Sequence, residues 1–534
     1  MSQQVYLKQN VLVEPLFNQW YAWPHLIPPA SAAMYIANLH LGIMRSYVRA
    51  PQVHAAAVKN PAMLGGPFID YQGKKVNEVK ALLDQTTGEQ SHMLEFAEAV
   101  KTLDVLLKTE AKGFSIESLY EKTPSILRGY VELVYDLNNQ PSIRFIEGLL
   151  YKSSFYNTSS QSISLSLIEQ DYRPFVLSTP RLQDDAHLQI NIPFDHAGID
   201  ELCKMRDVAQ SFDHIKEALG VSAGDADKFR TFFTPERHDG AGRRAAYTGD
   251  DLRVRYFGHA SVLFETKGVS IFTDPSVSYE YDSEISRYTF MDLPEVIDYV
   301  LLTHAHQDHI LLETLLQLRH KIRNVVIPRS MGGTLYDPSL KMILKRIGFK
   351  SVIELDELEE LEIEGGTITA LPFLGEHGDL SIRTKTAFQI RLGERSIVCA
   401  ADSNNLEPLL YNHIHDAIGD VDVMFLGMEC DGAPFSWVYG PLLTQAMERK
   451  LDQSRRLNGS DFIRAHDLVK RFNCGQVYIY AMGQEPWLNH IMCLRYTDQS
   501  PQIVESNKLL DECRKTGTVT ERLFGKKEML LKLA

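Results

Sequence analysis

The chain has 534 residues, of which 44% are hydrophobic and 23% are charged. This composition is ordinary for a soluble globular protein and excludes a disordered, collagen-like or membrane-embedded chain. The length exceeds that of one compact core, so we expect more than one domain. Lys and Arg total 55 against 69 Asp and Glu, a net charge of −14, which argues against nucleic acid or an anionic membrane as the main partner.

The cysteines and the N-terminal residues indicate the compartment. Six cysteines without a Cys-x-x-Cys pair disfavour a disulfide framework or a thiolate zinc site and fit a reducing environment. The first residues lack the basic and apolar regions of a signal peptide. The apolar stretch Leu26 to Met44 is interrupted by prolines, Asn38 and His40, so it does not predict a membrane-spanning helix. We expect a cytoplasmic protein.

Residues 1–240 predict an α+β domain. The beginning, with Trp20, Trp23 and a proline-containing run of small residues, predicts ordered but irregular chain that wraps the surface. The spacing of apolar residues from Met93 to Leu107 predicts a helix with one apolar face. Period-2 alternation over 162–167 and 188–192 predicts half-buried strands. No catalytic constellation stands out in this part.

A polar, glycine-bearing linker is predicted over 235–250, before a second domain that covers 250–534. Short apolar runs in this half predict strands, among them a hairpin formed by 262–265 and 269–272, and residues 310–318 predict an apolar helix. The other predicted strands lie at 252–256, 299–302, 325–327, 397–399, 423–426 and 477–480. Strands with interleaved helices indicate a layered α/β domain with functional loops at the strand ends.

The strongest functional signal follows the buried strand 299–302. Three imidazoles and one carboxylate, from His304, His306, Asp308 and His309, fall within six residues. In an extended turn His304 and His306 point the same way and can chelate one cation. Asp308 and His309, at the start of the following helix, can hold a second cation nearby. The pattern predicts a dinuclear metal site.

Further candidate ligands follow other predicted strands. Asp274 ends one strand and can orient a ligand histidine, and Asp402 follows another and can bridge two cations. Glu376 and His377 are neighbours, and one of them is expected to be a ligand. His377 would complete a nitrogen-rich site suited to zinc, whereas Glu376 would give a carboxylate-rich site suited to iron or manganese. The spacing does not decide between them.

The second half resembles the metallo-β-lactamase fold superfamily, because the strand-end Asp274, the histidine motif and Asp402 occur in that superfamily's order. This resemblance implies an αββα sandwich around a dinuclear metal site. The whole chain is similar to the metallo-β-lactamase-fold di-iron β-hydroxylases of chloramphenicol and nonribosomal peptide pathways. The similarity includes the total length, the extra N-terminal domain, and the placement of the histidine motif, Glu376 and Asp402.

The resemblance implies a ligand set for two iron ions. His304, His306 and Glu376 would hold one iron, Asp308, His309 and His490 the other, and Asp402 would bridge them. We choose His490 because it follows the last strong strand, and expect the remaining candidate histidines to be structural: His259, His413, His415 and His466. Asp274 and His377 would surround the ligands. The catalytic residues would be Glu376 and Glu429, the latter at a strand end near the cluster.

The resemblance also implies an activity. The enzyme would be an O2-dependent monooxygenase that hydroxylates the β-carbon of an L-aminoacyl group, tethered as a thioester to a peptidyl-carrier domain. It would need two Fe ions, O2 as co-substrate and an external electron donor. The N-terminal domain would support a homodimer and shape substrate access. Two basic clusters could receive an acidic carrier, although a solvated helix face is the commoner explanation of each: Lys341, Lys345 and Arg346, and Arg449, Lys450, Arg455 and Arg456.

Two alternatives remain open. One is a zinc metallo-hydrolase of the superfamily, with His377 as a ligand, acting on a lactone, a thioester or a phosphodiester. The other is a non-catalytic scaffold that binds the carrier. Metal analysis distinguishes them, because the oxygenase would contain two irons, the hydrolase two zincs, and the scaffold no metal.

Overall fold

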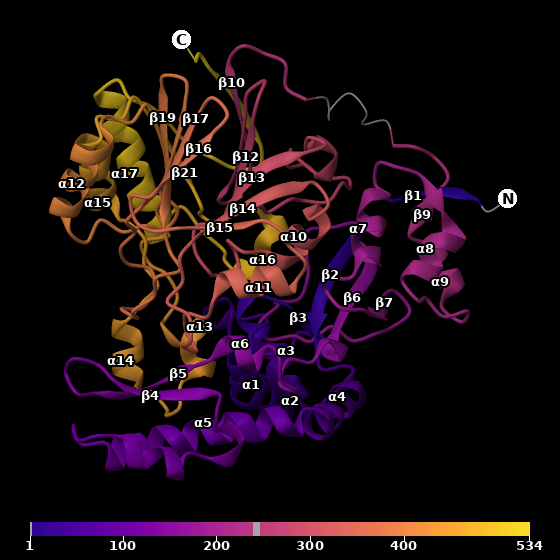
Figure 1. Ribbon diagram of the computed structural model, residues 1–534. Coiled ribbons are helices and arrows are strands. Elements are labelled where there is room, and N and C mark those ends of the chain that lie inside the picture. The colour runs from indigo at the N-terminus through magenta and orange to yellow at the C-terminus, as the bar shows by residue number, and fades with distance from the viewer. Residues whose placement is uncertain (1–2, 239–245, 534) are drawn as a thin grey trace.

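The computed structural model describes residues 3–238 and 246–533 (Figure 1). The N-terminal half, indigo to magenta in Figure 1, contains helices and small antiparallel sheets. The C-terminal half, which runs from magenta-pink through orange to yellow, contains two larger sheets with helices outside them. No helix in the described ranges is long and apolar enough to cross a membrane. The predicted linker at 235–250 lies partly outside the described residues, so the domain boundary stays a prediction.

The N-terminal half has the predicted α+β character. One antiparallel sheet has the order β3-β2-β6-β7, and a smaller sheet has the order β8-β1-β9. The predicted helix and the two predicted strands are present as α5, β6 and β7. The strands are β1 (Gln4–Leu7), β2 (Val11–Phe17), β3 (Trp20–Tyr21), β4 (Val131–Tyr135), β5 (Pro141–Phe145), β6 (Gln161–Leu167), β7 (Leu188–Asn191), β8 (Gln210–Ser211) and β9 (Phe233–Thr234).

The stretch that the sequence predicted to be irregular is helical and buried. The helix α1 (Pro29–Tyr35) continues through a π-helical turn, Ile36–His40, into α2 (Leu41–Arg49). Trp20 and Trp23 are 1% and 2% exposed. The prediction was wrong because proline at the first position of a helix is favourable, since its missing N–H has no intrahelical partner there. The other helices of this half are α3 (Pro51–Ala57), α4 (Val76–Glu89), α5 (Ser91–Glu110), α6 (Glu147–Leu150), α7 (Ala197–Lys204), α8 (Phe212–Ala218) and α9 (Ala226–Arg230).

In the described part of the C-terminal half, two seven-stranded sheets pack face to face. The first has the order β15-β14-β13-β12-β11-β10-β23, with bounds β10 (Leu252–Gly258), β11 (Ser261–Glu265), β12 (Ser270–Thr273), β13 (Ile297–Leu301), β14 (Ile322–Pro328), β15 (Val352–Leu355) and β23 (Lys527–Leu531). The second has the order β16-β17-β18-β19-β20-β21-β22, with bounds β16 (Glu360–Ile363), β17 (Gly366–Leu371), β18 (Ala387–Leu392), β19 (Arg395–Cys399), β20 (Val423–Gly427), β21 (Gln476–Tyr480) and β22 (Val519–Arg522).

Helices cover the outer faces of both sheets. The inner faces share one core, in which the rings of Phe264 and Phe425 lie 5.9 Å apart. The helices α12 (Pro408–Ile418), α15 (Phe462–Arg471) and α17 (Pro501–Lys515) lie beside the second sheet, and α10 (Leu312–Leu318) and α11 (Leu340–Arg346) beside the first (Figure 1). The helix–sheet–sheet–helix order confirms the predicted αββα sandwich.

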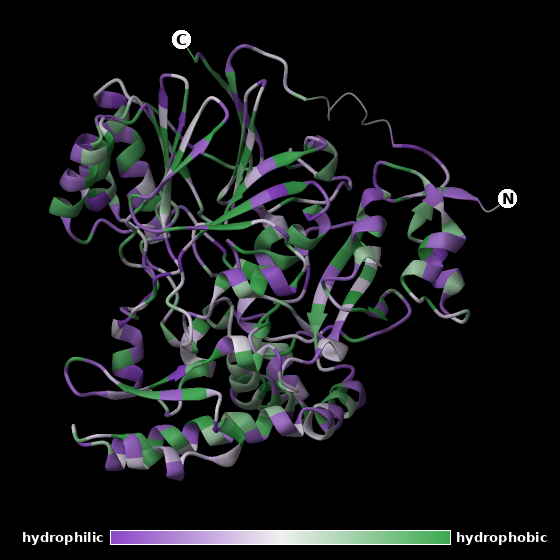
Figure 2. Cartoon of the chain, viewed as in Figure 1, coloured by the Kyte–Doolittle hydropathy of each residue, from purple (hydrophilic) through white to green (hydrophobic). Residues whose placement is uncertain are grey.

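The two halves share a hydrophobic core. One continuous cluster of buried residues contains Leu12 and Trp20 of the N-terminal half together with Val300 and Leu315 of the sandwich. Figure 2 shows green and purple residues mixed along the strands of the sandwich and along the outer helix α5. The N-terminal half is therefore packed against the helical layer outside the first sheet.

Candidate metal centre

The predicted site residues lie in loops that follow the strands of both sheets. The His304–His309 loop follows β13, and other loops follow β10, β12, β17, β19 and β20. Several non-glycine residues there have left-handed backbone conformations: His259 (φ 51°), Asp274 (φ 34°), Glu376 (φ 66°) and Ala401 (φ 47°). Such conformations cost free energy and are concentrated at functional sites. The backbone around the candidate site is therefore strained at several strand ends.

One candidate metal position, called the first metal position below, comprises His304, His306 and Glu376, whose candidate ligand atoms lie within 4.8 Å of one another. His306 Nδ1 is 2.9 Å from Glu376 Oε1, and His304 Nε2 is 3.7 Å from Glu376 Oε2. All three side chains are buried. This geometry matches the predicted contents of one metal position.

His377 lies beside this position, but it is not part of the group of candidate ligand atoms to which Glu376 belongs. Its ring stacks on that of His306, with centroids 4.6 Å apart and an interplanar angle of 26°. Its Nδ1 is 3.2 Å from the carbonyl oxygen of Gly375 and 3.3 Å from Glu376 Oε2. Of the two neighbours that the sequence left open, the geometry thus favours Glu376 as the ligand.

Another candidate, called the second metal position below, comprises His259, Asp308 and His309, whose candidate ligand atoms also lie within 4.8 Å of one another. Asp308 Oδ2 is 3.2 Å from His259 Nε2 and 3.6 Å from His309 Nε2. Asp402 lies between the two positions, because its Oδ2 is 3.0 Å from His309 Nε2 and 3.7 Å from His304 Nε2. A bridging role for Asp402 fits this placement.

The structure does not bring His490 to the cluster, which corrects its assignment as a ligand. His490 lies in α16 (Asn489–Met492), and its Nδ1 is 3.2 Å from an η nitrogen of Arg173. Its Nε2 is 4.0 Å from Glu313. A guanidinium against the imidazole repels a second cation, so this ring is unsuited to bind metal.

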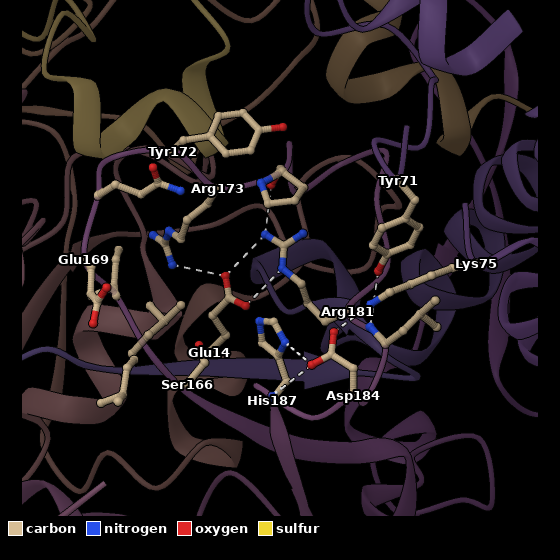
Figure 3. A pocket seen from close by; sticks show the side chains of 16 residues that line it. Glu14, Tyr71, Lys75, Ser166, Glu169, Tyr172, Arg173, Arg181, Asp184 and His187 are labelled. Atoms are coloured by element: carbon tan, nitrogen blue, oxygen red, sulfur yellow. Dashed lines mark hydrogen bonds and ion pairs between the residues drawn. The ribbon is translucent and has the colours of Figure 1, made fainter. Parts of the chain in front are cut away.

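Arg173 belongs to a buried ionic network where the two halves meet. It pairs with Glu14 at 3.1 Å and Glu313 at 3.0 Å, and Arg181 also pairs with Glu14 at 3.0 Å. Figure 3 shows Glu14, Arg173 and Arg181 at the wall of a cavity of about 530 Å³. Burial alone would raise the pKa of Glu14, but the two arginines lower it below its usual value. The network stabilises the junction and is separate from the metal cluster.

His259, expected to be structural, is the residue that sequence reasoning missed. It lies in the turn between β10 and β11, where its carbonyl accepts from Ala481 N at 2.9 Å. Gly483 N–H donates to His259 Nδ1 at 3.1 Å, which leaves Nε2 toward Asp308. The sequence shows only a histidine in a hairpin turn. Whether that turn lies at the same edge of the sheet as the His304–His309 loop depends on how β10 pairs in the sheet.

Asp274 orients His309, as predicted from its position at the end of β12. Its carboxylate accepts from the backbone N–H of Thr303 at 2.8 Å, from the Thr303 hydroxyl at 2.6 Å and from His309 Nδ1 at 2.8 Å. All of these groups are buried. This arrangement fixes the His309 ring with Nε2 toward Asp402, which is the usual role of a carboxylate behind a metal-binding histidine.

The chemistry of the site fits two cations. Five buried polar atoms of the site lack a hydrogen-bond partner among the described residues: His259 Nε2, His304 Nε2, Glu376 Oε2, His377 Nε2 and Asp402 Oδ1. Burial raises the pKa of Glu376 to about 7, although His306 opposes this shift. Unsatisfied buried atoms and crowded carboxylates are costly, and bound cations relieve both costs. The mixed imidazole and carboxylate donors suit iron or manganese.

A cavity of about 270 Å³ leads to the cluster. Glu429 lies in its wall with Asp308 and Asp402, close to the cluster as predicted, and burial followed by the repulsion of Asp402 raises its pKa well above the usual value. Leu64 and Gly65 of the N-terminal half line the same cavity. Both halves of the chain therefore shape access to the candidate metal centre.

Comparisons with known proteins agree with this architecture. A family described as the diiron non-heme beta-hydroxylase N-terminal domain matches residues 6–236, and a beta-lactamase superfamily domain matches residues 253–440. The chain is 38% identical over 529 residues to the 4-amino-L-phenylalanyl-[CmlP-peptidyl-carrier-protein] 3-hydroxylase of Streptomyces venezuelae. The aligned region covers 98% of this chain and 99% of that protein.

The solved structures give the same result. The crystal structure of CmlA, a diiron beta-hydroxylase from Streptomyces venezuelae, superposes with a TM-score of 0.93 over 99% of this chain and all of that chain, at 38% identity. A mutant of CmlA superposes with a TM-score of 0.91 over the same share. This agreement in sequence and structure extends over both halves of the molecule, and the chain therefore belongs to the family of diiron non-heme β-hydroxylases.

Proposed function

We propose that this enzyme hydroxylates the β-carbon of an L-aminoacyl group held as a thioester on the phosphopantetheine arm of a peptidyl-carrier domain. The observation that carries the proposal is the full-length similarity to a relative named as a 3-hydroxylase of an aminoacyl group on a peptidyl-carrier protein. The similarity includes the N-terminal half, which the separate beta-lactamase superfamily match does not cover.

The proposed ligands are the two triads described above, with Asp402 between them. His304, His306 and Glu376 hold one iron, and His259, Asp308 and His309 hold the other. When bound, the two irons supply the activation of O2. Inserting one oxygen atom into a C–H bond reduces the other to water, so the reaction also consumes two electrons and two protons. An external electron donor is therefore part of the proposal.

The protein side chains provide positioning and protons. Asp274 holds His309 in one ring orientation. Glu429 lies in the cavity wall outside both triads, and burial followed by the repulsion of Asp402 raises its pKa, which favours a protonated carboxyl group in the metal-free protein. We assign to Glu429 the placing of a proton beside the site where the β-carbon reacts. Leu64 and Gly65 bring the N-terminal half to the path of the tethered substrate.

The carrier is expected to dock at the mouth of this cavity. Of the basic clusters proposed from the sequence, Arg455 and Arg456 lie just after α14 (Arg449–Ser454), and Arg456 lines the cavity. Arg456 pairs with Asp431 at 3.1 Å and Lys341 in α11 pairs with Glu354 at 2.9 Å, but Lys341 is not among the residues that line this cavity. The second cluster is therefore the better candidate for contact with the carrier. The homodimer and the cytoplasmic location stay predictions.

One experiment tests the proposal. Candidate aminoacyl groups are loaded on the cognate carrier domain, reductant and O2 are added, and the carrier is examined for a mass gain of about 16 daltons, one oxygen atom. Metal content is measured on the same protein. Two irons and the mass gain support the proposal. Two zincs with release of the aminoacyl group would instead identify a thioester hydrolase, and two irons with no gain on any candidate would contradict the proposal.

A further inference from the structure

A short segment of the sandwich contacts two residues of the first metal position. We call residues 435–443 the buttress segment; it contains α13 (Ser436–Tyr439). Tyr439 Oη lies 2.8 Å from His306 Nε2, while His306 Nδ1 lies 2.9 Å from Glu376 Oε1. A cation shared by His306 and Glu376 would be bound through Nδ1. The Nε2–H group is then left to donate to Tyr439.

The same segment packs against the loop that carries Glu376. Gly378 lies in this loop with φ +57°, and a Cβ there would stand 2.7 Å from the ring of Phe435. Arg455 donates to the carbonyl of Gly378 at 2.7 Å, and its guanidinium lies 4.5 Å from the centre of the Phe435 ring. The buttress segment therefore restrains Glu376 as well as His306.

The N-terminal half holds the buttress segment by its backbone and by one indole. Tyr35 Oη donates to the carbonyl of Val438, and Asn38 Nδ2 donates to the carbonyl of Pro441 at 2.7 Å. Trp437 Nε1 donates to the carbonyl of Gly65 at 2.9 Å. Asn38 lies in the π-helical turn that joins α1 to α2, and such turns are frequent at functional sites.

The second metal position has a different set of supports. Within the described ranges, the hydrogen bonds and ion pairs recorded for the side chains of His259, Asp308 and His309 all involve residues of the sandwich. The N-terminal half reaches the first position through the contact of Tyr439 with His306, whereas it reaches the second only through the packing of α10, which follows His309, against β2 and α7.

We infer that Tyr439 is a positioning residue for His306, and that the N-terminal half fixes the first metal position through the buttress segment. The second position takes its hydrogen-bond and ion-pair partners, within the described ranges, from the sandwich. This inference rests on the metal ligands proposed above, but not on the reaction. It assigns to the N-terminal half a role in building the metal centre.

The test measures metal binding. Metal-free protein is titrated anaerobically with Fe²⁺ in equilibrium dialysis, and thermal unfolding confirms that each variant is folded. The variant is Tyr439→Phe, which removes only the hydroxyl. The matched control is Tyr151→Phe, because the Tyr151 hydroxyl is buried in the N-terminal half and has no hydrogen-bond partner among the described residues.

Two backgrounds separate the positions. His259→Ala disables the second position and Glu376→Ala disables the first. We expect Tyr439→Phe to weaken Fe²⁺ binding about 10-fold in the first background and to leave it unchanged in the second. Tyr35→Phe should act in the same direction but more weakly, and should add nothing once Tyr439 is phenylalanine, since both lie on one route.

Equal Fe²⁺ affinities of Tyr439→Phe and the control in the His259→Ala background would overturn the inference, as would equal weakening in both backgrounds. If the His259→Ala protein binds no iron, Tyr439→Phe is tested as a single variant in the otherwise unmodified chain. Loss of one of two tightly bound ions in Tyr439→Phe supports the inference, and retention of both overturns it. A wild-type protein that binds two irons but gives no mass gain would contradict the proposed reaction and leave this comparison intact.

Discussion

The two metal positions differ in what holds them. The second uses His259, Asp308 and His309, which are fixed by strand-end turns and by Asp274, all within the sandwich. The first uses a carboxylate in a strained loop and a histidine that contacts the buttress segment, which the N-terminal half holds. This difference gives the N-terminal half a structural role at the first metal position.

The largest expected effect comes from removing the carboxylate of the first position. Glu376→Ala should lose iron from that position and lower hydroxylation at least about 100-fold, the upper end of the range for groups that only support a ligand. Iron analysis and the mass of the carrier-bound product measure both effects. A variant that retained two irons and normal turnover would remove Glu376 from the ligand set and abolish the comparison.

The junction network should affect stability and not metal binding. Arg173→Met leaves the buried carboxylates of Glu14 and Glu313 without one of their cations, and should lower the free energy of unfolding by about 3–5 kcal/mol. Denaturant unfolding measures this change. Iron affinity of the folded variant should match wild type at both positions; a selective loss at the first would mean that the junction acts on the metal through a route other than the buttress segment.

The same network predicts a pH dependence. The pKa of Glu14 is lowered in the folded protein, so its ion pairs contribute stability above the ordinary pKa of a glutamate, and that contribution is lost as the pH falls through the lower folded value. The wild type should therefore lose more stability on acidification than a Glu14→Gln variant. Parallel unfolding curves for the two proteins between neutral and acidic pH would contradict this expectation.

The second position has its own sensitive support. Asp274→Asn removes the charge behind His309 and should weaken iron binding at the second position about 10- to 100-fold. The first position should weaken less, because Asp274 reaches His304 only through the Thr303 hydroxyl, 3.1 Å from His304 Nδ1. Dialysis in the Glu376→Ala and His259→Ala backgrounds separates the two. Weakening of both positions to the same degree would show that they are not supported independently.

The smallest expected effect concerns a single contact with the buttress segment. Asn38→Ala removes the donor to the carbonyl of Pro441, a hydrogen bond with a net contribution of about 1 kcal/mol, and should weaken iron binding at the first position about fivefold or less. Fe²⁺ dialysis beside the Tyr151→Phe control detects this. An effect larger than that of Tyr439→Phe would place the main support elsewhere in the π-helical turn.

The sandwich and most of the site were predictable because their signals are local. Apolar runs such as Val423–Gly427 identify buried strands, and polar residues directly after them identify Asp274 and Asp402. His259 was missed and His490 chosen wrongly because strand pairing, not spacing, decides which histidine reaches the cluster. The buttress segment was not predicted because three of its contacts use backbone carbonyls, which leave no pattern in the sequence.

The left-handed backbone at His259 and Glu376 has a consequence for protein engineering. Glycine adopts such a conformation without the steric cost that a side chain incurs, so either position should gain local backbone stability from glycine in the absence of iron. A redesign guided by folding stability alone would favour glycine at both positions and would thereby remove both metal-binding side chains. Thermostable variants of this enzyme therefore require selection for bound metal as well as for resistance to heat.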